Sequence, residues 1–174
     1  VVAAFKVGDE ALSSVFLYLM GYAASNALAF GSLILLGSAG KEAVTYEDLA
    51  GAGRRHPAAA LPFVVGVFSL MGMPPTAGFF GKYYVFSSAV QAGGYLFWLA
   101  VLGVLASVVS AYYYLRVLVY LFMREPKPGA PLAVPLRSWY VTAALLVSGY
   151  FVLKMGLSPG NYLELAIAAA TNLV

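Results

Sequence analysis

The chain has 174 residues, of which 62% are hydrophobic and 10% are charged, and its formal net charge is +3. Soluble domains carry about 25% charged residues, so this composition excludes an ordinary soluble protein and indicates an all-α membrane protein. With no cysteine, one histidine and seven acidic residues, the chain offers no disulfides, no iron–sulfur ligands and no cluster of side chains for a metal or haem.

Several uncharged stretches are longer than the roughly 20 helical residues that cross a bilayer. We expect spans over residues 11–36, 58–93, 95–123 and 138–157, and a terminal helix over 161–174 near the membrane surface or against the bundle. Several prolines between residues 126 and 135 forbid a continuous helix there. The sequence therefore predicts a single transmembrane domain over residues 1–174, built as a polytopic helical bundle with about four spans.

The second hydrophobic region, residues 58–93, is too long for one straight helix. At about 1.5 Å per residue its length would far exceed a bilayer core of about 30 Å. Pro74 and Pro75 lie inside it, and proline removes a backbone donor and clashes with the preceding turn. We therefore predict a helix broken near residues 70–78, which a membrane tolerates only where protein or water satisfies the freed backbone groups.

Lys82 follows this double proline and is the only Asp, Glu, Lys, Arg or His between Pro57 and Leu115. It precedes Gly93 by eleven residues, about 17 Å along a helix, and so lies near the middle of the core. Desolvation and the positive end of a helix that starts near Thr76 would both favour a neutral amine. Lys82 is therefore predicted to take up and release a proton; alternatively, it pairs with an acid outside this chain and only locks helices together.

Other residues could complete a hydrated path to Lys82. Gly78 and Gly81 leave room beside the backbone, and Ser107, Ser110 and Tyr114 share one helix face by their spacing. The alternative for that face is packing of small residues, with the serine hydroxyls bonded to their own helix. His56 precedes Pro57 at the start of a predicted helix and is either a solvated loop residue or a point of proton entry.

The basic residues predict how the chain is oriented. The loops over residues 38–57 and 124–137 hold six of the ten lysines and arginines, whereas Lys6 and Lys154 are assigned to the opposite side. Because cytoplasmic loops carry the excess of basic residues, both loops are predicted to face the cytoplasm or an equivalent compartment. The basic residues flank membrane spans without forming a basic helix, so no nucleic-acid partner is expected.

The run from Leu70 to Phe86, LMGMPPTAGFFGKYYVF, resembles the signature of the family of the N subunit of respiratory complex I. This family is also called NADH–quinone oxidoreductase chain N, or NADH dehydrogenase subunit 2. Three further segments agree with the family in order and spacing: residues 18–22 with 29–30, residues 48–51 with 54–57, and residues 110–117.

The resemblance implies an antiporter-like fold of about fourteen membrane helices built from inverted repeats, of which this chain would hold roughly the last four. The five apolar residues before Lys6 also read as the tail of a helix that starts earlier, or alternatively as a trimmed or short natural N-terminus. The proton-handling lysine of the family's broken helix maps onto Lys82. The family's glutamate and further lysines, in its first repeat and central helices, have no counterpart here.

By the same resemblance, the chain would belong to a proton-translocating subunit of NADH–quinone oxidoreductase in the cell inner membrane or an equivalent membrane. Its partners would be the other membrane subunits of complex I, including neighbouring antiporter-like subunits, and the lipid bilayer. NADH, FMN, iron–sulfur clusters and quinone would belong to other subunits, with no cofactor on this chain. The alternatives are a subunit of a multisubunit cation/proton antiporter or of a membrane-bound hydrogenase, and a purely structural membrane subunit.

Overall fold

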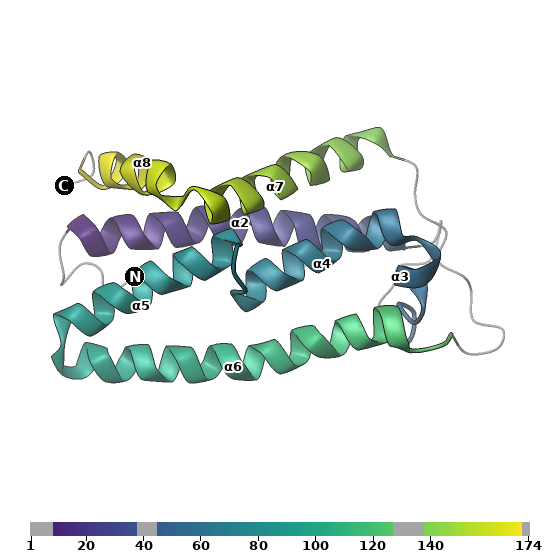
Figure 1. The fold of residues 1–174 in the computed structure, drawn as a ribbon, viewed down its shortest axis with the longest axis horizontal. Helices are drawn as coiled ribbons and strands as arrows, with labels where there is room; N and C mark the ends of the chain where they lie inside the picture. The colour runs from purple at the N-terminus through teal and green to yellow at the C-terminus, as the bar shows by residue number, and fades with distance from the viewer. Residues whose placement is uncertain (1–8, 38–44, 127–137, 172–174) are drawn as a thin grey trace.

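The computed structural model describes residues 9–37, 45–126 and 138–171, and all regular structure in these ranges is helical. The longer helices lie along a common axis and form an elongated bundle (Figure 1). The helices are α2 (Asp9–Leu36), α3 (Ala52–Arg55), α4 (Pro57–Met71), α5 (Ala77–Ala92), α6 (Gly94–Met123), α7 (Trp139–Leu157) and α8 (Pro159–Thr171). The predicted all-α fold class is confirmed.

Within the described ranges, three segments are long and apolar enough to cross a membrane as single helices: Ala11–Leu36 in α2, and the whole of α6 and α7. Helix α4 is apolar but has only 15 residues. At about 22 Å it is shorter than a bilayer core of about 30 Å. The region 58–93 therefore crosses the bundle as two half-helices, α4 and α5.

The break predicted in that region is present. Helix α4 ends at Met71, Gly72 adopts a left-handed conformation with φ +92°, and α5 begins at Ala77. The peptide bond between Pro74 and Pro75 is cis. Because only glycine adopts a left-handed backbone without a steric cost from Cβ, Gly72 lets the chain leave α4 directly after its last turn.

Helix α2 passes beside the break at its own midpoint. A Cβ atom added to Gly21 would lie 3.1 Å from Ala77 Cβ, and one added to Gly81 would lie 3.0 Å from Tyr18 Cα. Such small residues let neighbouring helices approach closely in a membrane. The break and the start of α5 therefore lie beside the middle of α2, and the depth of Lys82 in a bilayer stays a prediction.

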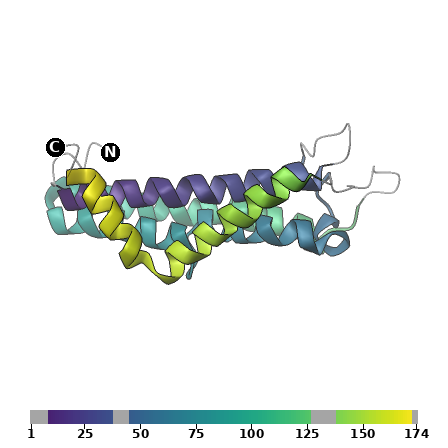
Figure 2. The ribbon, with the colours of Figure 1, turned by 90° about the horizontal axis from the view of Figure 1, so that it is seen from above.

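Helices α7 and α8 also cross the bundle as two segments. Gly156, at the end of α7, lies against the break, since an added Cβ would overlap the Pro75 carbonyl oxygen. From there α8 runs beside the first half of α2, where Ala166 joins a core cluster with Leu17. Figure 2 shows the two helices meeting in a V whose apex points away from α2.

This arrangement corrects the position assigned to Lys154. Lys154 precedes Gly156 by two residues and lies in the last turn of α7. It is therefore beside the break rather than at the end of the bundle opposite the basic loops. The physical reason is that α7 ends at Leu157, where Gly156 packs against Pro75, and α8 then continues the chain along α2.

The segment before α4 packs against the end of α6. The Gly51 amide donates to the Tyr120 carbonyl at 3.2 Å, and the rings of Tyr46 and Tyr120 lie 5.5 Å apart. The described parts of the two basic loops, residues 45–56 and 124–126, therefore lie at one end of the bundle (Figure 1). Which side of the membrane this end faces stays a prediction, and Lys41, Lys127 and Arg137 lie outside the described residues.

Candidate functional site at the helix break

Lys82 reaches back from α5 across the break to the end of α4. Its Nζ donates hydrogen bonds to the carbonyl oxygens of Leu70 and Met71, at 2.9 and 3.1 Å. The last carbonyls of a helix have no partner within that helix, and they form the negative end of its dipole. The amine therefore satisfies two backbone acceptors that the break leaves free. The negative end of the α4 dipole favours the charged amine, whereas the positive end of the α5 dipole disfavours it.

A cavity of about 190 Å³ lies beside this amine. Its lining comes from α2, α4, α5 and α6, and includes Tyr18, Tyr22, Ser69, Gly78, Ser107, Ser110 and Tyr114 as well as Lys82. A cavity of this size has room for several water molecules, and hydroxyl groups on its wall offer the polar partners that ordered water needs. The predicted stripe on α6 is thus brought together with Lys82 at one site.

The serines of that stripe also show the bonding pattern of the alternative interpretation. Ser107 Oγ donates to the Gly103 carbonyl and Ser110 Oγ to the Ala106 carbonyl, each at 2.9 Å. A hydroxyl that donates to its own helix keeps lone pairs free to accept a hydrogen bond. The two interpretations of the stripe are therefore compatible, because the same serines both line the cavity and bond to α6.

Two further cavities lie next to the first. A second cavity, of about 500 Å³, is also bordered by Leu70 and Tyr114, extends to Thr45 and Tyr46, and is lined mainly by apolar groups. A third, of about 590 Å³, lies on the other side of Lys82 and is lined mainly by apolar groups, including Phe79 and Phe86. Lys82 thus stands where the first and third cavities meet.

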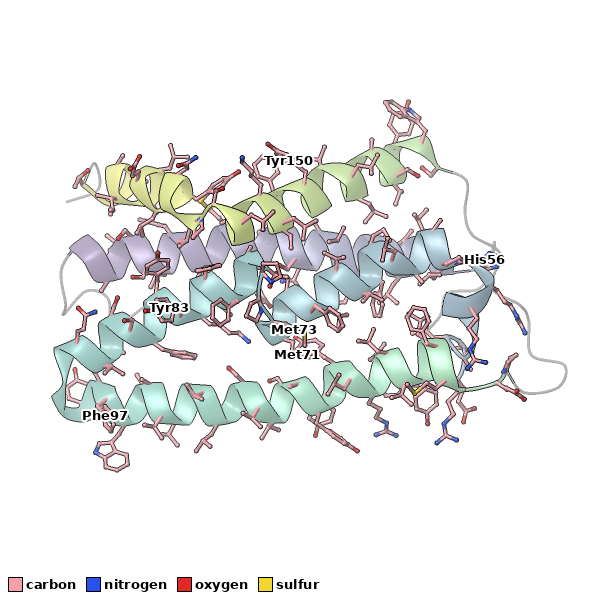
Figure 3. All side chains as sticks on the ribbon, in the orientation of Figure 1. His56, Met71, Met73, Tyr83, Phe97 and Tyr150 are labelled. Atoms are coloured by element: carbon pink, nitrogen blue, oxygen red, sulfur yellow. The ribbon has the colours of Figure 1, made fainter. Side chains whose placement is uncertain are left out.

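The residues of the break itself form the frame of the site. Figure 3 places Met71 and Met73 at the gap between α4 and α5, close to the middle of the bundle. Thr76 Oγ1 donates to the Met73 carbonyl at 2.6 Å and closes the turn that contains Pro74 and Pro75. Gly78 and Gly81 serve close packing: Gly78 lies against the end of α4 and Gly81 against α2.

His56 is not brought to Lys82. It lies at the loop end, where its backbone joins α3 to α4 (Figure 3). The 15 residues of α4 separate it from the break, about 22 Å along the helix.

Sequence patterns did not indicate Tyr18, Tyr22 or Ser69 as site residues. Tyr18 and Tyr22 are one helical turn apart on α2, and their rings stack at 5.8 Å. The i, i+4 spacing of two tyrosines within an apolar span is the signal that could have identified a polar face. Ser69 gave no such signal, because a lone serine in an apolar helix usually bonds to its own backbone.

Known proteins related to this chain give its family. Residues 1–110 match the transmembrane family described as NADH:quinone oxidoreductase/Mrp antiporter. NADH-quinone oxidoreductase subunit N 1 of Sorangium cellulosum is 54% identical over 97% of this chain and 33% of its own length. Subunit N 1 of Solibacter usitatus is 41% identical over 95% of this chain and 33% of its own length.

The fold is also similar to a solved structure. A chain of respiratory complex I from Thermus thermophilus, determined with bound aureothin, superposes with a TM-score of 0.73 at 35% identity, over 88% of this chain and 34% of that chain. This chain thus spans about one third of the length of the curated relatives it matches. It belongs to the NADH:quinone oxidoreductase/Mrp antiporter transmembrane family.

Proposed function

We propose that this chain is part of the proton-translocating membrane subunit N of an NADH–quinone oxidoreductase, and that Lys82 carries the proton. The observation that carries this proposal is the position of Nζ, which lies at the break on two main-chain carbonyls and beside a hydroxyl-lined cavity. An ionisable side chain at this depth is typical of proton pathways in membrane proteins. The relatives from Sorangium and Solibacter carry the corresponding name.

The two hydrogen bonds suit an amine that changes its protonation state. An ammonium group has three N–H donors, and a neutral amine keeps two. The carbonyls of Leu70 and Met71 accept two donors, so both forms can hold the same position. The third proton of the ammonium group is then free for exchange with water in the cavity.

The pathway proposed here runs from Lys82 toward the loop end through two neighbouring cavities. Tyr114 borders both the Lys82 cavity and the cavity that extends to Tyr46. Its phenol group can donate and accept a hydrogen bond, and so can pass a proton between waters on its two sides. Protons would thus reach Lys82 from the loop end past Tyr114.

The rest of the activity would lie outside this chain. We propose that its partners are the other membrane subunits of complex I, including antiporter-like ones, in the cell inner membrane or an equivalent membrane. NADH, FMN, iron–sulfur clusters and quinone would bind to other subunits. The contribution of this chain would be a proton-binding amine at a helix break.

The test is the variant Lys82→Met in the assembled complex. Proton translocation per NADH oxidised should fall strongly, because Lys82 is the only Asp, Glu, Lys, Arg or His between Pro57 and Leu115 and nothing local can replace it as a proton carrier. Lys82→Arg should also impair translocation, since guanidinium stays protonated. Translocation would be followed in energised membrane vesicles, and assembly by native gels.

Lys154→Met is the matched control, because it removes the neighbouring lysine of α7, which lies near the break but does not line the Lys82 cavity. It should leave the ratio of protons to NADH within about twofold of the parent, as expected for a residue outside the exchange site. Full translocation by an assembled Lys82→Met complex would show that the Lys82 amine is structural.

We further propose that the basic loops face the cytoplasm. The chain has no cysteine, so Glu125→Cys and Gln91→Cys would introduce single thiols at exposed positions near opposite ends of α6. A membrane-impermeant maleimide should label the Gln91→Cys variant in intact cells and the Glu125→Cys variant only after permeabilisation. The reverse pattern would overturn the orientation.

A further inference from the structure

We propose that Ser69 is a positioning residue, which joins the two half-helices and so sets where Lys82 meets the carbonyls of Leu70 and Met71. The inference rests on the proposed role of Lys82 in proton transfer. In this inference, Ser69 of α4 accepts the hydrogen bond from the start of α5 that the N-cap side chain of α5 would usually accept.

The first turn of α5 is capped from the other half-helix. Helix N-termini leave backbone amides without partners, and the N-cap side chain usually accepts from one of them. Within the described segment 45–126, Thr76 at the N-cap of α5 makes no such bond, since its hydroxyl donates back to Met73. The Gly78 amide donates instead to Ser69 Oγ at 3.1 Å, from the last turn of α4.

Ser25 of α2 completes the link. Its Oγ lies 2.6 Å from Ser69 Oγ and 2.6 Å from the carbonyl oxygen of Gly21. Ser69 Oγ accepts from both the Gly78 amide and the Ser25 hydroxyl. Because a hydroxyl has one proton, Ser25 shares that proton between Ser69 Oγ and the carbonyl oxygen of Gly21. This chain of hydrogen bonds joins α5, α4 and α2 at the break.

Burial makes the link costly to remove. Ser25 and Ser69 are both 0% exposed, so no bulk water replaces a lost hydroxyl. Without Ser69 Oγ, the Gly78 amide would lose the acceptor that holds it to α4, and water in the Lys82 cavity, which Gly78 also lines, would be a weaker replacement that joins no helices. The hydroxyl therefore favours the arrangement in which the start of α5 stays against the end of α4.

The same contact sets the geometry of Lys82. Ser69 immediately precedes Leu70 and Met71, which accept the hydrogen bonds from Lys82, and Gly78 lies one helical turn before Lys82 on α5. The bond from Gly78 to Ser69 therefore fixes the amine and its two acceptors relative to each other. A shift of one half-helix along the other would change both distances from Nζ.

Three variants of the assembled complex test the inference: Ser69→Ala, Ser25→Ala and Ser69→Thr. The first readout is amide hydrogen exchange at the start of α5, and it needs no proton translocation. Ser69→Ala should raise exchange of the Gly78 amide about tenfold, since a buried hydrogen bond holds it closed. Ser25→Ala should raise it less, because Ser69 keeps its contact with Gly78. Ser69→Thr keeps the hydroxyl and should restore slow exchange.

The second readout is the ratio of protons translocated to NADH oxidised, as a function of pH. Ser69→Ala should lower this ratio below about half of the parent value and shift its pH dependence, because misplacement of a reacting group by about 1 Å can cost up to about 100-fold. The titratable groups of the described chain that face Lys82 across the two cavities beside it are the phenols of Tyr18, Tyr22, Tyr83 and Tyr114, and all four stay in place in every variant.

Ser32→Ala is the matched control. Ser32 is a serine of α2 with 0% exposure, and it donates to the Leu28 carbonyl of its own helix. It should change neither readout. If the Ser69→Ala complex does not assemble, both hydrogen exchange at Gly78 and the ratio of protons to NADH are measured on the Ser25→Ala complex instead.

Two results would overturn the inference. One is unchanged exchange of Gly78 in an assembled Ser69→Ala complex, and the other is faster exchange with an unchanged ratio and pH dependence. The proposed role of Lys82 would survive either result. Conversely, full translocation by Lys82→Met would remove that role, and the exchange measurement would still report whether Ser69 joins the half-helices.

Discussion

The break between α4 and α5 and the continuous helix α6 both present serine hydroxyls to the cavity beside Lys82, but these hydroxyls bond differently. On α6, Ser107 and Ser110 donate to carbonyls of their own helix four residues earlier. At the break, Ser69 accepts from the Gly78 amide of the next helix and contacts Ser25 of α2. The same residue type lines the cavity in one region and connects helices in the other.

The difference follows from the backbone. An unbroken helix uses all its internal amides, so a serine within it finds only a carbonyl of the previous turn. A break releases amides at the start of one half-helix and carbonyls at the end of the other. Ser69 takes one of these amides, and Lys82 takes two of the carbonyls. Interrupting a membrane helix thus creates the positions that polar side chains then occupy.

The break is also more tightly packed than α6. Of the 30 residues of α6, only Leu96, Ala100 and Leu121 are buried within the described chain. At the break, Ala77, Gly78 and Gly81 are all buried, and they lie against α2 or α4. Substitutions at the break should therefore disturb more contacts within the described chain than substitutions on α6.

The largest effect is expected from Gly78→Ala. An added Cβ would overlap the Ser69 carbonyl oxygen, and backbone cannot move aside without separating the half-helices. We expect a loss of about 3 kcal/mol or more, at the upper end of overpacking effects, and hence a marked loss of assembled complex. The measurement is the amount and melting temperature of the assembled complex on native gels after heating.

Gly103→Ala on α6 is the control for that substitution. An added Cβ would lie 2.7 Å from Cε1 of Phe86, an atom at the edge of a side chain that can rotate. The cost should stay within about 1 kcal/mol, offset in part by the higher helix propensity of alanine. Equal losses from the two variants would show that the break is no more tightly held than α6.

The smallest effect is expected from the double variant Ser107→Ala with Ser110→Ala. Each serine donates to a carbonyl that already belongs to the α6 hydrogen-bond ladder, so its loss leaves no backbone group without a partner. We expect a change in stability within about 0.5 kcal/mol and proton translocation within about twofold of the parent. A severalfold loss of translocation in the assembled double variant would instead place these hydroxyls in the proton pathway.

The sequence by itself determined the helical spans and the break, because each depends on local rules. Length and hydropathy predict helices that cross a bilayer, and Pro74 with Pro75 cannot continue a helix. The spacing of Ser107, Ser110 and Tyr114 places them on one face, since a helix has a fixed period. These rules need no knowledge of neighbouring helices.

Only the tertiary structure decided which groups contact Lys82 and the face of α6 that carries Ser107, Ser110 and Tyr114. The acceptors for Lys82 are main-chain carbonyls, and every residue has one, so no sequence pattern indicates which are free. Ser69 caps α5 only because the break brings it to Gly78, and Gly156 ends α7 beside Pro75 only because no side chain keeps them apart. Such contacts depend on how closely helices pack, which side-chain volumes across the whole bundle determine.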